Sequence, residues 1–149
     1  MDGYNPQDFG PPDAMAGGSQ SKHSMEILTE SAKKEDPNVD LKEYVKNLVI
    51  AIKANKVFLL RMGNTVFVMR PLDKTTVEGH IATLDDMNTL QNNIATAFKT
   101  LKGLGYTHAT GTSSIAGFVR MAKQLGASYT QLPISAEHPV PTYQFDMDL

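Results

Sequence analysis

The chain has 149 residues, of which 41% are apolar and 20% charged, and its formal net charge is -2. These values are typical of one globular domain in water, alone or with a tail. The absence of cysteine excludes disulfides, thiolate catalysis and cysteine-ligated zinc. The balanced charge argues against nucleic acid or an anionic membrane as a partner, and no apolar run approaches the roughly 20 residues of a membrane helix.

Residues 1–22 are rich in glycine and proline and contain only isolated apolar side chains. Such a segment cannot bury enough apolar surface to offset the entropy lost on ordering. We therefore expect an extended arm, held either by a neighbouring chain or by its own domain. Its anchors on a partner would be Tyr4, Phe9 and Met15.

Residues 23–39 form either a linker or a short helix. The apolar pair Ile27 and Leu28 favours a helix over 24–35, with Ser24 as its cap, and Pro37 would end it.

The main domain is predicted to cover residues 40–149. Asp40 and Glu43 form a capping-box-like start. Apolar residues then recur at helical spacing, which predicts a helix that runs to about Asn55. They are Leu41, Val45, Leu48, Val49 and Ile52.

Two β-rich runs follow, joined by Gly63 and Asn64, and this arrangement predicts a hairpin. Pro71 should end its second strand. A third strand is predicted over 75–83. Its alternation places Val77 and Ile81 on one face, and Glu78, His80 and Ala82 on the other.

The rest of the chain alternates helices and strands. Asp85 and Asp86 should cap a helix that ends at Gly103 or Gly105, and a short strand is predicted over 106–110. The hydroxyl-rich stretch that follows reads as a turn, with Ser113 or Ser114 capping a helix that stops at Gly126. Two last strands are predicted over 128–132 and 142–148.

This order predicts an α/β (α+β) fold with a mixed, mostly antiparallel sheet and helices on both faces. The periodic apolar faces predict that eight side chains are largely buried. These are Leu48, Ile52, Phe67, Ile81, Ile94, Phe98, Phe118 and Leu125.

From residue 40 to residue 149 the element order resembles the GCN5-related N-acetyltransferase (GNAT) family. The stretch from Gln124 to Ala127 resembles the leucine-glycine turn after that family's last helix. The resemblance implies a GNAT-like fold. It also implies a site for acetyl-CoA, whose pyrophosphate is bound in the family by a glycine-containing loop at a helix N-terminus.

The chain departs from that family in its site residues. The matching loop, 83–88, has no glycine and carries Asp85 and Asp86, which oppose an anionic ligand. Many family members place a proton-donating tyrosine four residues before the glycine of the turn, and here that position is Ala122. Glu78 and His80 are the candidates for the family's catalytic base, although both also fit a solvated strand face.

No histidine spacing indicates a metal site. These departures lead us to expect a non-enzymatic structural protein without a cofactor, similar to the GNAT-like components of phage virions. Its partners would be other protein subunits, possibly symmetric copies, in a capsid, tail or ejection apparatus. The alternatives are a divergent acetyl-CoA-dependent N-acetyltransferase, with its cofactor between 81–83 and 106–110 and a cytoplasmic location, and a small adaptor module.

Overall fold

The computed structural model describes residues 22–113, 116–136 and 140–149. Tyr4, Phe9, Met15 and Ser114 lie outside these ranges. The helices are α1 (Ser24–Glu35), α2 (Leu41–Lys53), α3 (Met87–Gly103) and α4 (Ala116–Gln124). The strands are β1 (Phe58–Met62), β2 (Thr65–Pro71), β3 (Thr76–Thr83), β4 (His108–Ser113), β5 (Ser128–Gln131) and β6 (Tyr143–Asp148).

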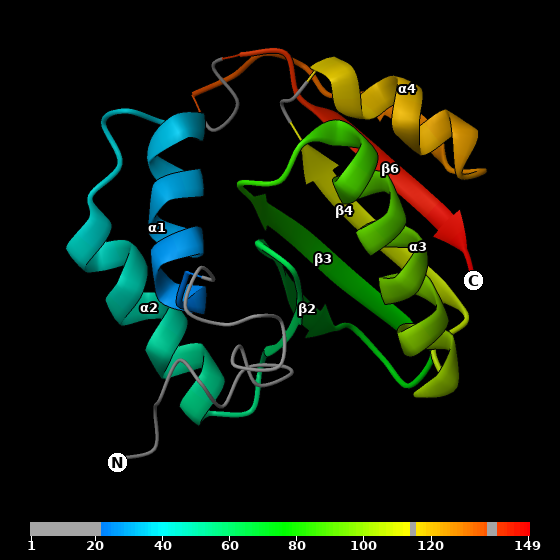
Figure 1. Ribbon diagram of the computed structural model, residues 1–149, viewed down its shortest axis with the longest axis horizontal. Helices are drawn as coiled ribbons and strands as arrows, with labels where there is room; N and C mark the ends of the chain where they lie inside the picture. The colour runs from blue at the N-terminus through cyan, green and yellow to red at the C-terminus, as the bar shows by residue number, and fades with distance from the viewer. Residues whose placement is uncertain (1–21, 114–115, 137–139) are drawn as a thin grey trace.

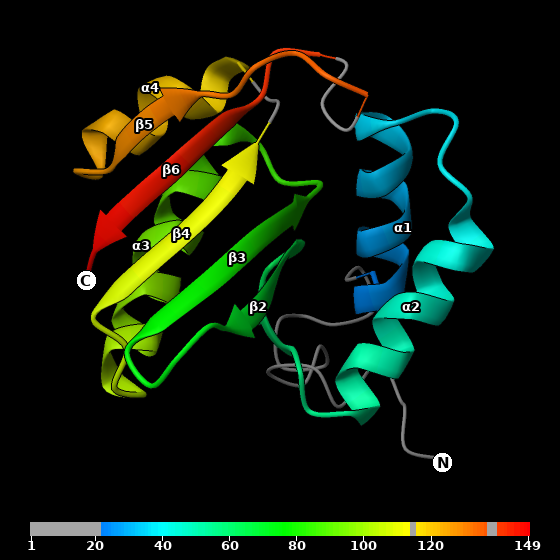
Figure 2. The ribbon, with the colours of Figure 1, turned by 180° about the vertical axis from the view of Figure 1, so that it is seen from behind.

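The strands form one sheet in the order β1-β2-β3-β4-β6-β5. Every neighbouring pair is antiparallel except β3 and β4, which run parallel. Helices α1 and α2 cover one face of the sheet, and α3 and α4 cover the other (Figures 1 and 2). The predicted fold class is therefore confirmed. Within the described ranges, no helix is both long and apolar enough to cross a membrane.

Helix α1 is packed directly on the sheet. Ile27 and Leu28 have no exposed surface. The helix begins one residue earlier than a cap at Ser24 requires, so His23 holds the N-cap position and Ser24 lies inside the first turn. Ser24 is buried and accepts a hydrogen bond of 3.3 Å from the guanidinium of Arg61. Arg61 also donates to the carbonyl of Lys22, so a buried cation ties the start of α1 to β1.

The hairpin is confirmed, because Met62 and Thr65 pair on either side of the two-residue turn. The prediction for the hydroxyl-rich stretch is wrong. Strand β4 begins at His108 and runs through it to Ser113, which ends a strand and does not cap a helix. The reason is tertiary: β4 pairs along its whole length with β6, and this pairing outweighs the local turn preference of Gly111.

The core lies in two layers, one on each face of the sheet. Phe67, Val77, Ile94 and Phe118 belong to the layer under α3 and α4, and Leu48 belongs to the layer under α1 and α2. Of the eight side chains predicted to be buried, the following four are: Leu48, Phe67, Ile94 and Phe118. The others are partly exposed: Ile52, Ile81, Phe98 and Leu125.

The parallel pair is the irregular part of the sheet. Strands β3 and β4 are in register from Thr76 opposite His108 to Gly79 opposite Gly111, and their pairing ends there. Strand β3 nevertheless continues to Thr83 on β2, and β4 continues to Ser113 on β6. The sheet therefore splits into two halves that separate beyond the two glycines.

We expect Gly111→Ala to destabilise the protein by about 1–3 kcal/mol, the usual cost of overpacking. A Cβ at Gly111 would lie 2.4 Å from the carbonyl oxygen of Gly79, and a backbone atom cannot rotate away. The matched control is Gly103→Ala at the end of α3, where a Cβ meets nothing within 4 Å. That change should be neutral or stabilising. Urea unfolding of both variants measures the difference, and equal effects would contradict the close approach of the strands.

We expect the stability contribution of His108 to fade as the pH rises. Its Nδ1 lies 3.1 Å from Asp148 and its Nε2 lies 3.4 Å from Asp146. The hydrogen bond to Asp148 raises the pKa of His108, with a smaller contribution from Asp146, against the opposing effect of burial. A raised pKa stabilises the fold below the unfolded-state pKa, and this effect is lost as the pH rises through the folded-state value.

The measurement is the difference in unfolding free energy between the natural chain and His108→Gln. It should shrink from about pH 5.5 to about pH 8.5. A difference that grows with pH would show that His108 gains nothing from its carboxylate partners.

Candidate active site between the diverging strands

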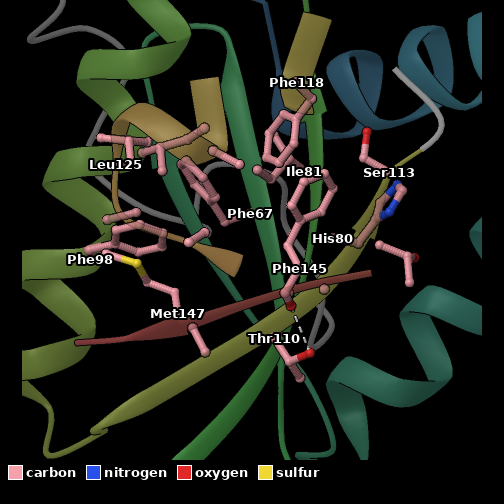
Figure 3. Close-up of a pocket in the computed structure, with 18 of the residues that line it drawn as sticks. Phe67, His80, Ile81, Phe98, Thr110, Ser113, Phe118, Leu125, Phe145 and Met147 are labelled. Carbon is pink, nitrogen blue, oxygen red and sulfur yellow. Dashed lines mark hydrogen bonds between the residues drawn. The ribbon is translucent and has the colours of Figure 1, made fainter. Parts of the chain in front are cut away.

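A cavity opens where β3 and β4 separate. Its volume is about 90 Å³. Its lining comes mainly from β3 and β4, from α3 and α4, and from β6 (Figure 3). Apolar side chains dominate it, among them Phe67, Ile81, Phe98, Phe118, Leu125 and Phe145. An apolar space with few polar groups at one end is the usual form of a small-molecule site.

The polar end of this cavity carries a histidine and a carboxylate. His80 and Glu35 both belong to its lining. Nε2 of His80 lies 3.6 Å from Oε1 of Glu35, and both side chains are partly exposed. Figure 3 draws His80 and Ser113 toward one end of the lining and Phe98 and Leu125 toward the other. A histidine beside a carboxylate at the mouth of an apolar cavity is an arrangement that can accept a proton.

A second depression adjoins the first on the face covered by α1 and α2. Val57, Val68, Arg70 and Glu78 line it, together with three residues that also line the first cavity: Gly79, His80 and Thr112. The two spaces therefore meet at the point where the strands divide. A ligand on the α3/α4 side and a second ligand on the α1/α2 side could meet beside His80.

The structure gives the two predicted base candidates different partners. Glu78 and His80 do project from the same face of β3, as predicted. Glu78 accepts hydrogen bonds of 2.9 and 2.5 Å from Arg70 on β2, so it forms a cross-strand ion pair. His80 instead faces Glu35. This geometry favours His80 over Glu78 as the proton acceptor.

Ala122 is 4% exposed and lines the cavity from α4, so it offers no proton at this position. The hydroxyl of Thr110 also lines the cavity and donates to the carbonyl of Phe145 at 2.9 Å. Among the described lining residues, His80 is therefore the best placed group for moving a proton near the strand divergence.

The turn between β3 and α3 is closed by its two carboxylates. Oδ2 of Asp85 accepts hydrogen bonds from the amide of Asn64, the hydroxyl of Thr65 and the side chain of Asn93, at 2.7–3.1 Å. Asp86 caps α3 by accepting from the amide of Thr89 at 2.8 Å. This hydrogen bond lowers the pKa of Asp86. The turn does not fit a diphosphate, because its helix end is already occupied by a carboxylate.

Sequence reasoning missed Glu35 and the two glycines of the divergence. Glu35 ends a helix that lies 45 residues from His80, and no local signal connects them. Gly79 and Gly111 did carry a signal, since glycine inside a strand often marks a close approach of another backbone. Within the described ranges, no cluster of histidine and acidic side chains could hold a metal ion.

Comparison with known proteins places the fold among acetyltransferases. A GNAT-superfamily phosphinothricin acetyltransferase from Sinorhizobium meliloti, in complex with AcCoA, matches with a TM-score of 0.60 and 10% identity over 85% of this chain and 83% of its own. A GNAT-family acetyltransferase from Elizabethkingia anophelis with acetyl-CoA bound matches with a TM-score of 0.55 and 14% identity. The match covers 78% of this chain and 87% of its own. A ribosomal-protein-alanine N-acetyltransferase from Brucella melitensis matches with a TM-score of 0.59 and 8% identity. The match covers 85% of this chain and 94% of its own.

No protein-family model matches the chain. No curated protein matches it either. The structural matches establish a GNAT-like fold, as predicted from the order of the elements.

These matches correct the functional prediction. A non-enzymatic structural protein of a phage virion was expected, and all three structures described above are acetyltransferases, two of them with acetyl-CoA bound. That expectation, and the expectation that the chain is not an enzyme, are therefore wrong. The expectation treated the altered helix end as evidence against any ligand site, although a cavity lies between the strands.

Proposed function

We propose that this protein transfers an acetyl group from a thioester of pantetheine, such as acetyl-CoA, to an amine. The observation that carries this proposal is the cavity at the divergence of β3 and β4, with His80 and Glu35 at its mouth. The likeness to acetyltransferases with acetyl-CoA bound supports the same reaction class.

The donor's pantetheine arm suits the gap between the strands. Beyond Gly79 and Gly111 the two strands no longer pair with each other, so backbone amides and carbonyls face a space that a strand does not fill. An arm that contains amide groups can hydrogen-bond to such an edge. The apolar lining then excludes water from the thioester.

The acceptor amine would occupy the depression on the α1/α2 side. Glu78 lines this depression and Glu35 lies 3.6 Å from His80, and these carboxylates favour a substrate that arrives as a cation. Glu78 is partly neutralised by Arg70, which leaves Glu35 as the nearer unshared carboxylate for the imidazole.

In the reaction, the bound ammonium first releases one proton to solvent, which gives its nitrogen a lone pair. That nitrogen attacks the carbonyl carbon of the thioester, and His80 accepts a second proton from it. The carbon–sulfur bond then breaks, and the departing thiolate receives a proton from the imidazolium. The products are the acetylated amine and the free thiol, so atoms and charges balance. Glu35 orients the imidazole and stabilises its cationic form, as carboxylates do for catalytic histidines.

The test is an assay of the full chain with saturating acetyl-CoA or acetyl-pantetheine and a panel of primary amines, read by thiol release and by the mass of the acetylated amine. We expect His80→Gln to lower kcat by about two to four orders of magnitude, because the general base is lost. Glu35→Gln should lower kcat less and shift the pH profile of kcat/KM.

The matched control is His23→Gln, at the start of α1 and outside the cavity lining. It should leave kcat unchanged. No thiol release with either donor, at any amine in the panel, would refute the proposed function. Equal activity of His80→Gln and the natural chain would remove His80 from the mechanism.

A further inference from the structure

The N-terminus of α3 borders the candidate donor cavity. Thr83 at the end of β3 lines the cavity, as do Leu90 and Ile94 in the first turns of α3. A helix N-terminus carries exposed amide groups and a partial positive charge, which makes it the natural place to bind a phosphate. Any phosphate attached to a donor in this cavity would be drawn to that end if it were open.

That helix end is blocked by fixed negative charge. Oδ1 of Asp86 already accepts a hydrogen bond from the backbone amide of Thr89. Because this hydrogen bond lowers the pKa of Asp86, the carboxylate is ionised at neutral pH. Asp85 cannot move aside to make room, because Asn64, Thr65 and Asn93 all donate to its Oδ2. Two carboxylates at one helix end repel a third anion.

Two further features also argue against a phosphate at the N-terminus of α3. The terminal methyl group of Met87, the first residue of α3, lies only 2.9 Å from where a Cβ on Gly117 of α4 would stand, so the side chain bridges these two helices. Among the described residues that line the cavity, none is a lysine or arginine that could pair with a phosphate.

We propose that this site selects a thioester donor by its pantetheine arm alone, and that it takes nucleotide-free pantetheine thioesters in preference to acetyl-CoA. This inference rests on the proposed function and specifies its donor class. The recognised chemistry is an acylated pantetheine arm. It arrives as a free small molecule without a phosphate.

The experiment compares the binding of pantetheine and coenzyme A to the full chain by calorimetry at low ionic strength. Pantetheine should bind at least as tightly as coenzyme A, although coenzyme A has many more atoms to contribute. Asp86→Asn keeps a capping side chain and removes one charge. It should tighten coenzyme A binding by about two- to fivefold, as expected for one charge at a helix end, and leave pantetheine binding unchanged.

Asp73→Asn is the matched control. Asp73 also accepts backbone amides, from Thr75 and Thr76, but it lies in the turn at the opposite end of β3. Its replacement should alter neither affinity. In the transfer assay, acetyl-pantetheine should give a higher kcat/KM than acetyl-CoA, and the reverse order would overturn the inference.

Coenzyme A that binds the natural chain about tenfold more tightly than pantetheine would overturn this inference and leave the proposed function in place. An Asp86→Asn variant with unchanged affinity for coenzyme A would do the same. Failure of both compounds to bind at millimolar concentration would overturn the proposed function together with the inference.

Discussion

The contact between Gly79 and Gly111 determines most of what is distinctive in this structure. At this point two parallel backbones approach so closely that a Cβ on Gly111 would lie 2.4 Å from the carbonyl oxygen of Gly79. Beyond it the strands follow different neighbours, because β3 remains paired with β2 and β4 with β6. The separation follows from these two stronger antiparallel pairings, and the cavity between the layers is its direct result.

The polar features of the site are arranged around this divergence. His80 is the first residue of β3 after the paired segment, so its side chain stands at the opening on the α1/α2 face. Helix α1 brings Glu35 to within 3.6 Å of its imidazole. Helix α1 itself depends on Ile27 and Leu28, which are fully buried against the sheet. The candidate base is thus positioned by packing that extends well beyond the cavity.

Local patterns predicted much of the fold. The hairpin, the amphipathic stripes of α2 and α3 and the glycine after α4 depend on residues that are close in sequence, and each appears where it was expected. The extent of β4 could not be predicted in this way, because its pairing with β6 joins residues 30 to 40 positions apart. The pairing of His80 with Glu35 could not be predicted for the same reason, because these residues are far apart in the sequence. The role of Asp85, which ties the β1–β2 turn to α3 and was expected to cap that helix, could not be predicted either.

The central claim is that the space between the diverging strands is the binding site for a pantetheine thioester. Its most direct test is a titration of the isotopically labelled chain with an unreactive thioether of pantetheine, followed through the backbone amide resonances. The account predicts shifts concentrated at Gly79, Ile81, Gly111 and Thr112, with the resonances of the edge strand β5 unchanged. Shifts confined to other surfaces, or no shifts at saturating concentration, would contradict it.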